Sequence, residues 1–171
     1  MNETALNQFV QLFTLMDTEA TQRVSERLAL VLRDPAAYQE QFAEELEERG
    51  IVAKLPAQEL RDVALVDALL SEDLLWEYDL QDTAADMAEG LNEILAQQKR
   101  TISVEVAQGS GRSAGGPEQL DALQEALEPL GLALVLLTLD SDAYPLSLVA
   151  EEQAESARRL AKELGFELAI Y

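Results

Sequence analysis

Apolar residues recur at helical spacing through the first hundred residues of the chain. The first segment carries one apolar stripe, made of Ala5, Leu6, Phe9, Leu12, Phe13 and Met16. A second helix is predicted over residues 19–32, with Val24, Leu28 and Val31 facing inward. Residues 57–70 are apolar nearly all round, which predicts a helix at the buried centre of this helical part.

Boundary signals delimit two further helices. Asp34 is a good N-cap, Pro35 fits the first helical position, and Gly50 is a C-terminal stop. These three residues predict a helix over residues 36–49. Another helix is predicted over residues 82–97.

The pattern changes period after residue 100. Alternating polar and apolar positions over 102–106 predict a half-exposed strand, and the continuous apolar run 132–139 predicts a central strand. A turn and a return strand through Leu146 and Leu148 complete an antiparallel hairpin, and alternation over 166–170 predicts a last strand. Helices are predicted between these strands, over 117–130 and 151–164.

These elements predict an α+β fold. A helical N-terminal half packs beside a small, mostly antiparallel sheet with helices in the C-terminal half. The length favours a single domain over residues 1–171, with a subdivision into a helical part, 1–75, and an α+β part, 76–171.

Acidic residues greatly outnumber basic ones. The chain has 33 Asp and Glu against 12 Lys and Arg, which gives a formal net charge of −21. This charge disfavours binding to nucleic acids and to anionic membranes and favours a basic partner. A signal peptide and an apolar run of membrane-spanning length are not apparent in this sequence, so a cytoplasmic location is expected.

The chain contains neither histidine nor cysteine. Catalysis by Ser-His-Asp or Cys-His groups, thiolate or imidazole metal sites, and disulfides are therefore excluded. No cofactor is predicted. This composition favours a non-enzymatic protein.

The acids are gathered in rows. Four of them follow one face of the helix at 82–97 and four follow one face of the helix at 117–130: Asp82, Asp86, Glu89, Glu93, Glu118, Asp121, Glu125 and Glu128. Glu40, Glu44 and Glu47 repeat the spacing in the third helix. Like charges at this spacing destabilise a helix slightly, so the rows are either ordinary solvated faces or a docking surface for a basic protein.

Other candidates are more local. Asp140 and Asp142 follow an apolar strand and could hold a divalent metal, although the spacing also suits a hairpin turn. Gly109 and Gly111 match a relaxed dinucleotide fingerprint, but the parallel βαβ unit that it needs is not predicted, so a loop is favoured. Asp67 lies among apolar neighbours and, if buried, would need a partner such as Arg61 or a backbone amide. The aromatic pair Trp76 and Tyr78 is expected to anchor the two halves.

Several short motifs in the C-terminal two thirds occur together in one domain family. They are Trp76-Glu77-Tyr78-Asp79, Leu91-Asn92, Leu139-Asp140-Ser141-Asp142 and Ala161-Lys162-Glu163-Leu164-Gly165-Phe166. Over residues 67–171 the chain resembles a bacterial domain family of unknown function. This resemblance implies an α+β fold and a bacterial source, and it supplies no catalytic residues.

The sequence therefore favours a protein-binding module, resembling immunity proteins or inhibitors, that presents its acidic helix faces to a basic partner. Two alternatives stay open. One is a metal-dependent enzyme or sensor that uses Asp140 and Asp142. The other is a structural homo-oligomer that associates through the apolar helix at 57–70.

Overall fold

The structure is a computed structural model that describes residues 3–79, 82–106, 116–138 and 143–171, with only the backbone described for 116–118 and 143. Its helices are α1 (Glu3–Thr14), α2 (Thr18–Arg33), α3 (Pro35–Gln41), α4 (Ala43–Glu48), α5 (Ala57–Ser71), α6 (Ala84–Gln97), α7 (Gly116–Leu127) and α8 (Ala154–Leu164). Short 3₁₀ turns, η1 (Glu128–Leu130) and η2 (Glu151–Gln153), flank the central hairpin. The strands are β1 (Trp76–Asp79), β2 (Leu132–Leu137), β3 (Ala143–Ala150) and β4 (Leu168–Ile170).

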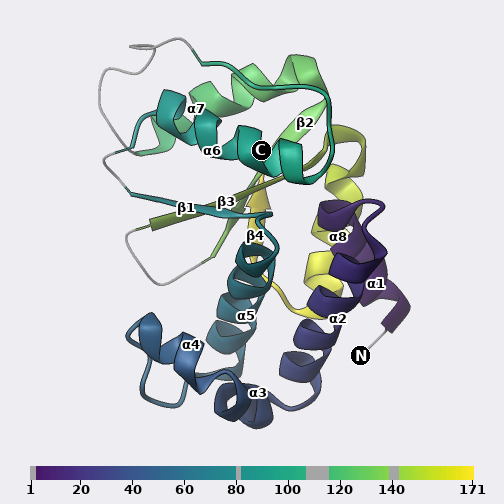
Figure 1. Ribbon diagram of the computed structural model, residues 1–171, viewed down its shortest axis with the longest axis vertical. Helices are drawn as coiled ribbons and strands as arrows, with labels where there is room; N and C mark the ends of the chain where they lie inside the picture. Colours follow the sequence, from purple (N-terminus) through teal and green to yellow (C-terminus); the bar gives the residue numbers. More distant parts are fainter. Residues whose placement is uncertain (1–2, 80–81, 107–115, 139–142) are drawn as a thin grey trace.

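The strands form one antiparallel sheet in the order β1-β3-β2-β4, which confirms the α+β fold and the predicted hairpin. The sheet lies between two helical layers (Figure 1). Helices α6 and α7 cover one face, and α1, α2, α5 and α8 lie on the other. Because the C-terminal helix α8 belongs to the same layer as the N-terminal helices, the two ends of the chain share one core.

The continuous apolar run of strand β2 is explained by its position between the two helical layers. Its residues alternate between the two helical layers: Leu132 and Leu134 join the core under α6 and α7, whereas Ala133, Val135 and Leu137 join the core with α1, α2, α5 and α8. A strand covered on both faces needs apolar side chains at every position. The two cores are therefore separated only by the sheet.

Most predicted helices are confirmed. Helix α5 is the most buried part of the N-terminal half, as expected, although Leu70 near its end is 39% exposed. Asp34 caps α3 by accepting a hydrogen bond from the Ala37 amide at 3.1 Å. Gly50, with φ of +83°, ends α4 in the left-handed conformation that favours glycine.

The predicted helix over 36–49 is wrong in one respect, because it is broken at Phe42. This residue leaves helical geometry at φ −104° and ψ 24°. Its ring stacks on Tyr38 with centroids 4.5 Å apart and lies 4.2 Å from the guanidinium carbon of Arg27. Packing of Phe42 beneath α2 accounts for the separation into α3 and α4.

The predicted strand over 102–106 is also wrong. These residues are described but pair with no strand. Instead, the side chain of Asn92 on α6 bonds both backbone groups of Val104, donating to its carbonyl at 2.9 Å and accepting from its amide at 2.7 Å. This clamp satisfies the backbone while Val104 is buried under α6.

Met16 was predicted to belong to the apolar stripe of the first helix, and this is wrong. Helix α1 ends at Thr14, and Leu15 adopts a positive φ of 56°. The chain turns there, which leaves Met16 92% exposed.

Candidate functional site

The acidic row on α6 begins at a well-capped helix terminus. Thr83 is the N-cap, and its hydroxyl accepts a hydrogen bond from the Asp86 amide at 3.2 Å. The Asp86 carboxylate in turn accepts from the Thr83 amide at 3.1 Å, which completes a capping box. Asp82 lies just before the helix and accepts from the Asp79 amide at 3.0 Å. Asp86 therefore also stabilises the helix start, a role that the Thr-x-x-Asp spacing signals, whereas Asp82 bonds the end of β1.

The other described acids of the two rows are directed to solvent. Glu89 and Glu93 are exposed on α6, and Asp121, Glu125 and Glu128 are exposed on α7 and η1. The side chain of Glu118 lies outside the described residues. Among the residues that the structure describes, none of the acids in either row forms an ion pair.

The two rows lie toward opposite edges of the sheet. Burial raises the pKa of Tyr78 on edge strand β1, and the nearby charges of Asp82 and Glu93 raise it further. Burial also raises the pKa of Tyr171, just after edge strand β4, with Asp121 adding to the effect. The α6 row thus borders β1, and the α7 row lies on the β4 side.

Trp76 gives the α6 row an aromatic neighbour. Trp76 and Tyr78 project from the same face of β1 and pack on Gly90, which lies between Asp86 and Glu93 along α6. Tyr78 is buried and donates to the Met87 carbonyl at 2.8 Å, whereas Trp76 is 37% exposed. The two aromatic side chains therefore hold β1 to α6. The prediction that they join the helical part to the α+β part is wrong.

A family model fits nearly the whole chain. The model of a domain of unknown function (DUF6630) matches residues 5–171. The chain belongs to this DUF6630 family. The family was expected to cover only residues 67–171, so the helical N-terminal part is an integral part of the DUF6630 domain. No curated protein and no solved structure matches the chain.

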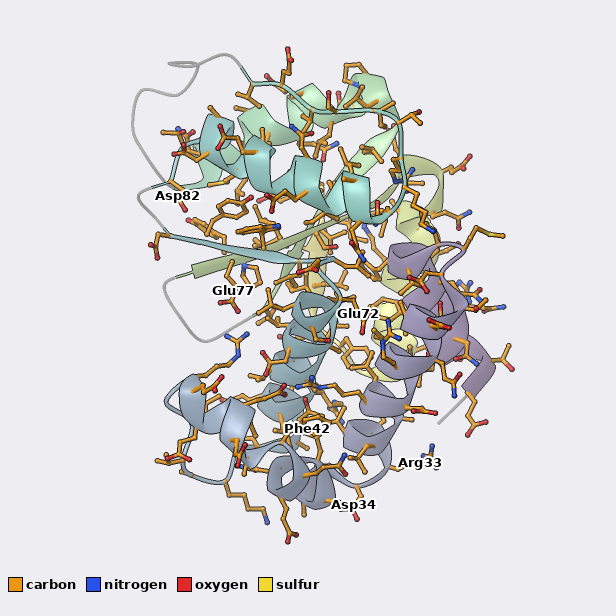
Figure 2. All side chains as sticks on the ribbon, viewed as in Figure 1. Arg33, Asp34, Phe42, Glu72, Glu77 and Asp82 are labelled. Carbon is orange, nitrogen blue, oxygen red and sulfur yellow. The ribbon has the colours of Figure 1, made fainter. Side chains whose placement is uncertain are left out.

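The DUF6630 domain has a second charged cluster on the other side of β1. Figure 2 shows Glu77 and Asp82 on opposite sides of this strand. Arg49 lies between Glu77, at 2.6 Å, and Asp67 of α5, at 2.5 Å, and its Nε also donates to Asp67. Arg27 of α2 pairs with Glu45 and lies 3.9 Å from Asp67.

This cluster corrects the partner expected for Asp67. Arg61 bonds Gln58 at 2.8 Å instead, and Arg49 is the residue that compensates the Asp67 charge. Burial raises the pKa of Asp67, and hydrogen bonding to Arg49 counteracts this only in part. Burial lowers the pKa of Arg49, but its bonds to Asp67 and Glu77 outweigh that effect and raise it overall. The cluster is a structural connection between helices and sheet.

The metal hypothesis rests on residues that the structure does not describe. Asp140 and Asp142 lie in the segment 139–142, between β2 and β3, and the glycine loop at 109–111 also falls outside the described residues. Within the described residues, no three carboxylates gather closely enough to hold a metal ion. A metal site at Asp140 and Asp142 stays a prediction.

None of the helices in the described ranges is long and apolar enough to cross a membrane. Most of the apolar side chains of α5 are packed inside the molecule. Oligomerisation through this helix stays a prediction.

Proposed function

We propose that this domain is a non-enzymatic protein-binding module, inhibitor-like in its action, that docks a basic protein against the acidic face of α6. The surface consists of Asp82, Asp86, Glu89, Glu93 and the exposed edge of Trp76. The α7 row, with Glu118, Asp121, Glu125 and Glu128, adds to the negative field from the other side of the helical layer.

Separation of charge within the molecule is the observation that carries this proposal. The ion pairs of the described residues involve Arg23, Arg27, Arg33, Arg49 and Arg158, all outside α6 and α7. Carboxylates without a cation partner keep their full charge for a partner protein. Such a field accelerates the association of a basic protein and weakens as salt is added.

Trp76 supports the α6 face over the other acidic faces. Tryptophan is enriched at protein interfaces, and its ring attracts lysine and arginine side chains. An exposed indole beside a row of carboxylates offers a cationic side chain both kinds of contact. The partner class that fits is a basic protein, such as a nucleic-acid-binding protein whose phosphate-binding groove the carboxylates would occupy.

Charge reversal at matched positions tests the proposal. The docking variant carries Glu89→Lys, Glu93→Lys, Asp121→Lys and Glu125→Lys. The control variant carries Glu40→Lys, Glu44→Lys, Glu47→Lys and Glu48→Lys, four exposed acids on α3 and α4, so both variants change the net charge equally. Proteins captured from cells of the source organism by the wild type and by the control, and lost from the docking variant, are the partners to study.

Association kinetics with a captured partner then decide the matter. We expect the docking variant to associate at least about tenfold more slowly at low salt, with a shallower salt dependence, while the control stays near the wild type. Equal capture by all three proteins, or equal association rates, would contradict the proposal.

A further inference from the structure

A pocket of about 560 Å³ lies where α1, the turn after α6 and the start of α8 meet. Two arginines line it, Arg100 after α6 and Arg159 on α8. Hydrogen-bonding side chains of Gln8, Gln153 and Ser156 line it as well, together with one carboxylate, Glu152. In a protein of net charge −21, a pocket with more cations than anions is unexpected.

The Arg100 side chain is anchored by a hydrogen bond to Gln98. Its Nε donates to the Gln98 side-chain oxygen at 2.8 Å, and the Gln98 amide nitrogen donates to the Phe13 carbonyl at 3.0 Å. Gln98 is only 6% exposed, so this anchor is part of the core. The two terminal nitrogens of Arg100 have no hydrogen-bond partner among the described residues, which leaves them available to a ligand in the pocket.

Neither arginine is neutralised by a carboxylate in the described part of the chain. Five of the eight arginines in that part form ion pairs, but Arg100 and Arg159 do not, and Glu152 lies beyond ion-pair distance of both. Burial lowers the pKa of Arg100, with no nearby acid to offset it. A guanidinium removed from water without a counter-charge is unfavourable, so an anion that replaces the lost water is bound favourably.

The turn η2 continues directly into α8, so the helical start beside the pocket is that of η2 and α8 together, and the Ala154 amide already donates to the Glu151 carbonyl. The N-cap residue of α8, Gln153, lines the pocket and makes no capping hydrogen bond through its side chain. Backbone amides at a helix start carry partial positive charge and favour anions. Glu151, Glu152 and Glu155 lie at the same helical start and oppose this attraction in part, whereas acids more than about 8 Å away are largely screened at physiological salt.

We propose that this pocket binds a small phosphate-bearing molecule through Arg100 and Arg159. The planar guanidinium group matches the oxygens of a phosphate, and two such groups match the charge of a phosphate monoester. The volume accommodates a phosphate with an organic substituent, for which Gln8, Gln153 and Ser156 supply hydrogen bonds. This binding is independent of the acidic docking face.

Calorimetric titration of the full chain tests the proposal, with inorganic phosphate and adenosine monophosphate as probes and sodium chloride of equal ionic strength as the blank. We expect saturable binding of at least one probe. Arg100→Gln and Arg159→Gln should each weaken it by about tenfold or more. The control, Lys162→Gln, makes the same charge change on α8 outside this pocket and should bind like the wild type.

Two results would overturn the proposal. One is the absence of saturable binding by both probes. The other is binding that survives both arginine substitutions or is weakened equally by Lys162→Gln. Because Arg159 is exposed, Arg159→Gln should remain folded even if Arg100→Gln does not, so the test does not depend on one variant. Amide chemical shifts of residues 153–156, measured by NMR during the same titration, locate the bound probe independently.

Discussion

Arg49 joins two carboxylates that come from different layers of the molecule. Asp67 belongs to α5 and Glu77 to β1, and the Arg49 side chain, which is 18% exposed, lies between them. The sequence predicts that a buried Asp67 needs a partner, and Arg61, six residues away, or a backbone amide was the expected one. The actual partner is 18 residues away, and local spacing carries no information about it.

We predict that Arg49→Met destabilises the protein by about 3 kcal/mol near pH 7, because it removes the closest cation from two partly buried carboxylates and leaves only Arg27, 3.9 Å from Asp67, beside them. Burial already raises the pKa of Asp67, and loss of Arg49 raises it further. When folding raises the pKa of an aspartate, the free energy of unfolding of the protein falls as the pH rises from the unfolded-state pKa through the folded-state pKa. The loss should therefore shrink as the pH falls through the raised pKa of Asp67, because the folded state then takes up the proton.

Urea unfolding of wild type and variant across this pH range measures the effect. Arg33→Met is the matched control, because its ion pair with Glu3 is 3.9 Å long and both side chains are more than half exposed. The control should change stability much less at every pH. A pH-independent loss in Arg49→Met would show that packing, and not charge, accounts for it.

At the scale of elements, α6 depends on contacts that its amphipathic pattern does not reveal. Gly90 lies in the middle of this helix, where glycine is unfavourable by about 1 kcal/mol relative to alanine. An added Cβ would overlap the Tyr78 hydroxyl oxygen and lie 2.7 Å from the Tyr78 Cζ atom. The close approach of β1 to α6 therefore requires glycine at this position.

We predict that Gly90→Ala destabilises the protein by about 1–3 kcal/mol despite its better helix propensity, because the rigid, buried Tyr78 ring must shift. Thermal and urea unfolding measure the change. Tyr78→Phe alone should cost about 1 kcal/mol through the lost bond to Met87. In the Gly90→Ala background, Tyr78→Phe should cost less or restore stability, since the worst overlap is with the hydroxyl oxygen. Strictly additive effects would contradict the steric explanation.

At the scale of the whole molecule, 33 acids against 12 bases produce self-repulsion in the folded state. The exposed rows on α6 and α7 contribute to it without local compensation. We predict that the melting temperature at neutral pH rises as sodium chloride is increased from low to physiological concentration, because screening relieves this repulsion.

The docking variant described above should show a smaller rise, since it replaces four exposed acids with lysines. Differential scanning calorimetry at several salt concentrations provides the measurement. If the melting temperatures of both proteins rose equally with salt, repulsion within the two rows would not contribute measurably to the stability.

The sequence by itself determined most of the helices, the antiparallel hairpin and the excluded chemistry, because periodicity, capping residues and composition are local or additive properties. It also predicted Asp34 as a cap and α5 as a buried helix. It could not predict the break at Phe42 or the missing strand at 102–106, since a ring packed beneath α2 and an asparagine clamp replaced the local preference. Only the tertiary structure showed which of the described carboxylates are paired with arginines and which of the described arginines have no carboxylate partner. It also showed that the Tyr78 side chain leaves room only for glycine at position 90. Those properties depend on side chains that are distant along the chain and meet only when the layers pack.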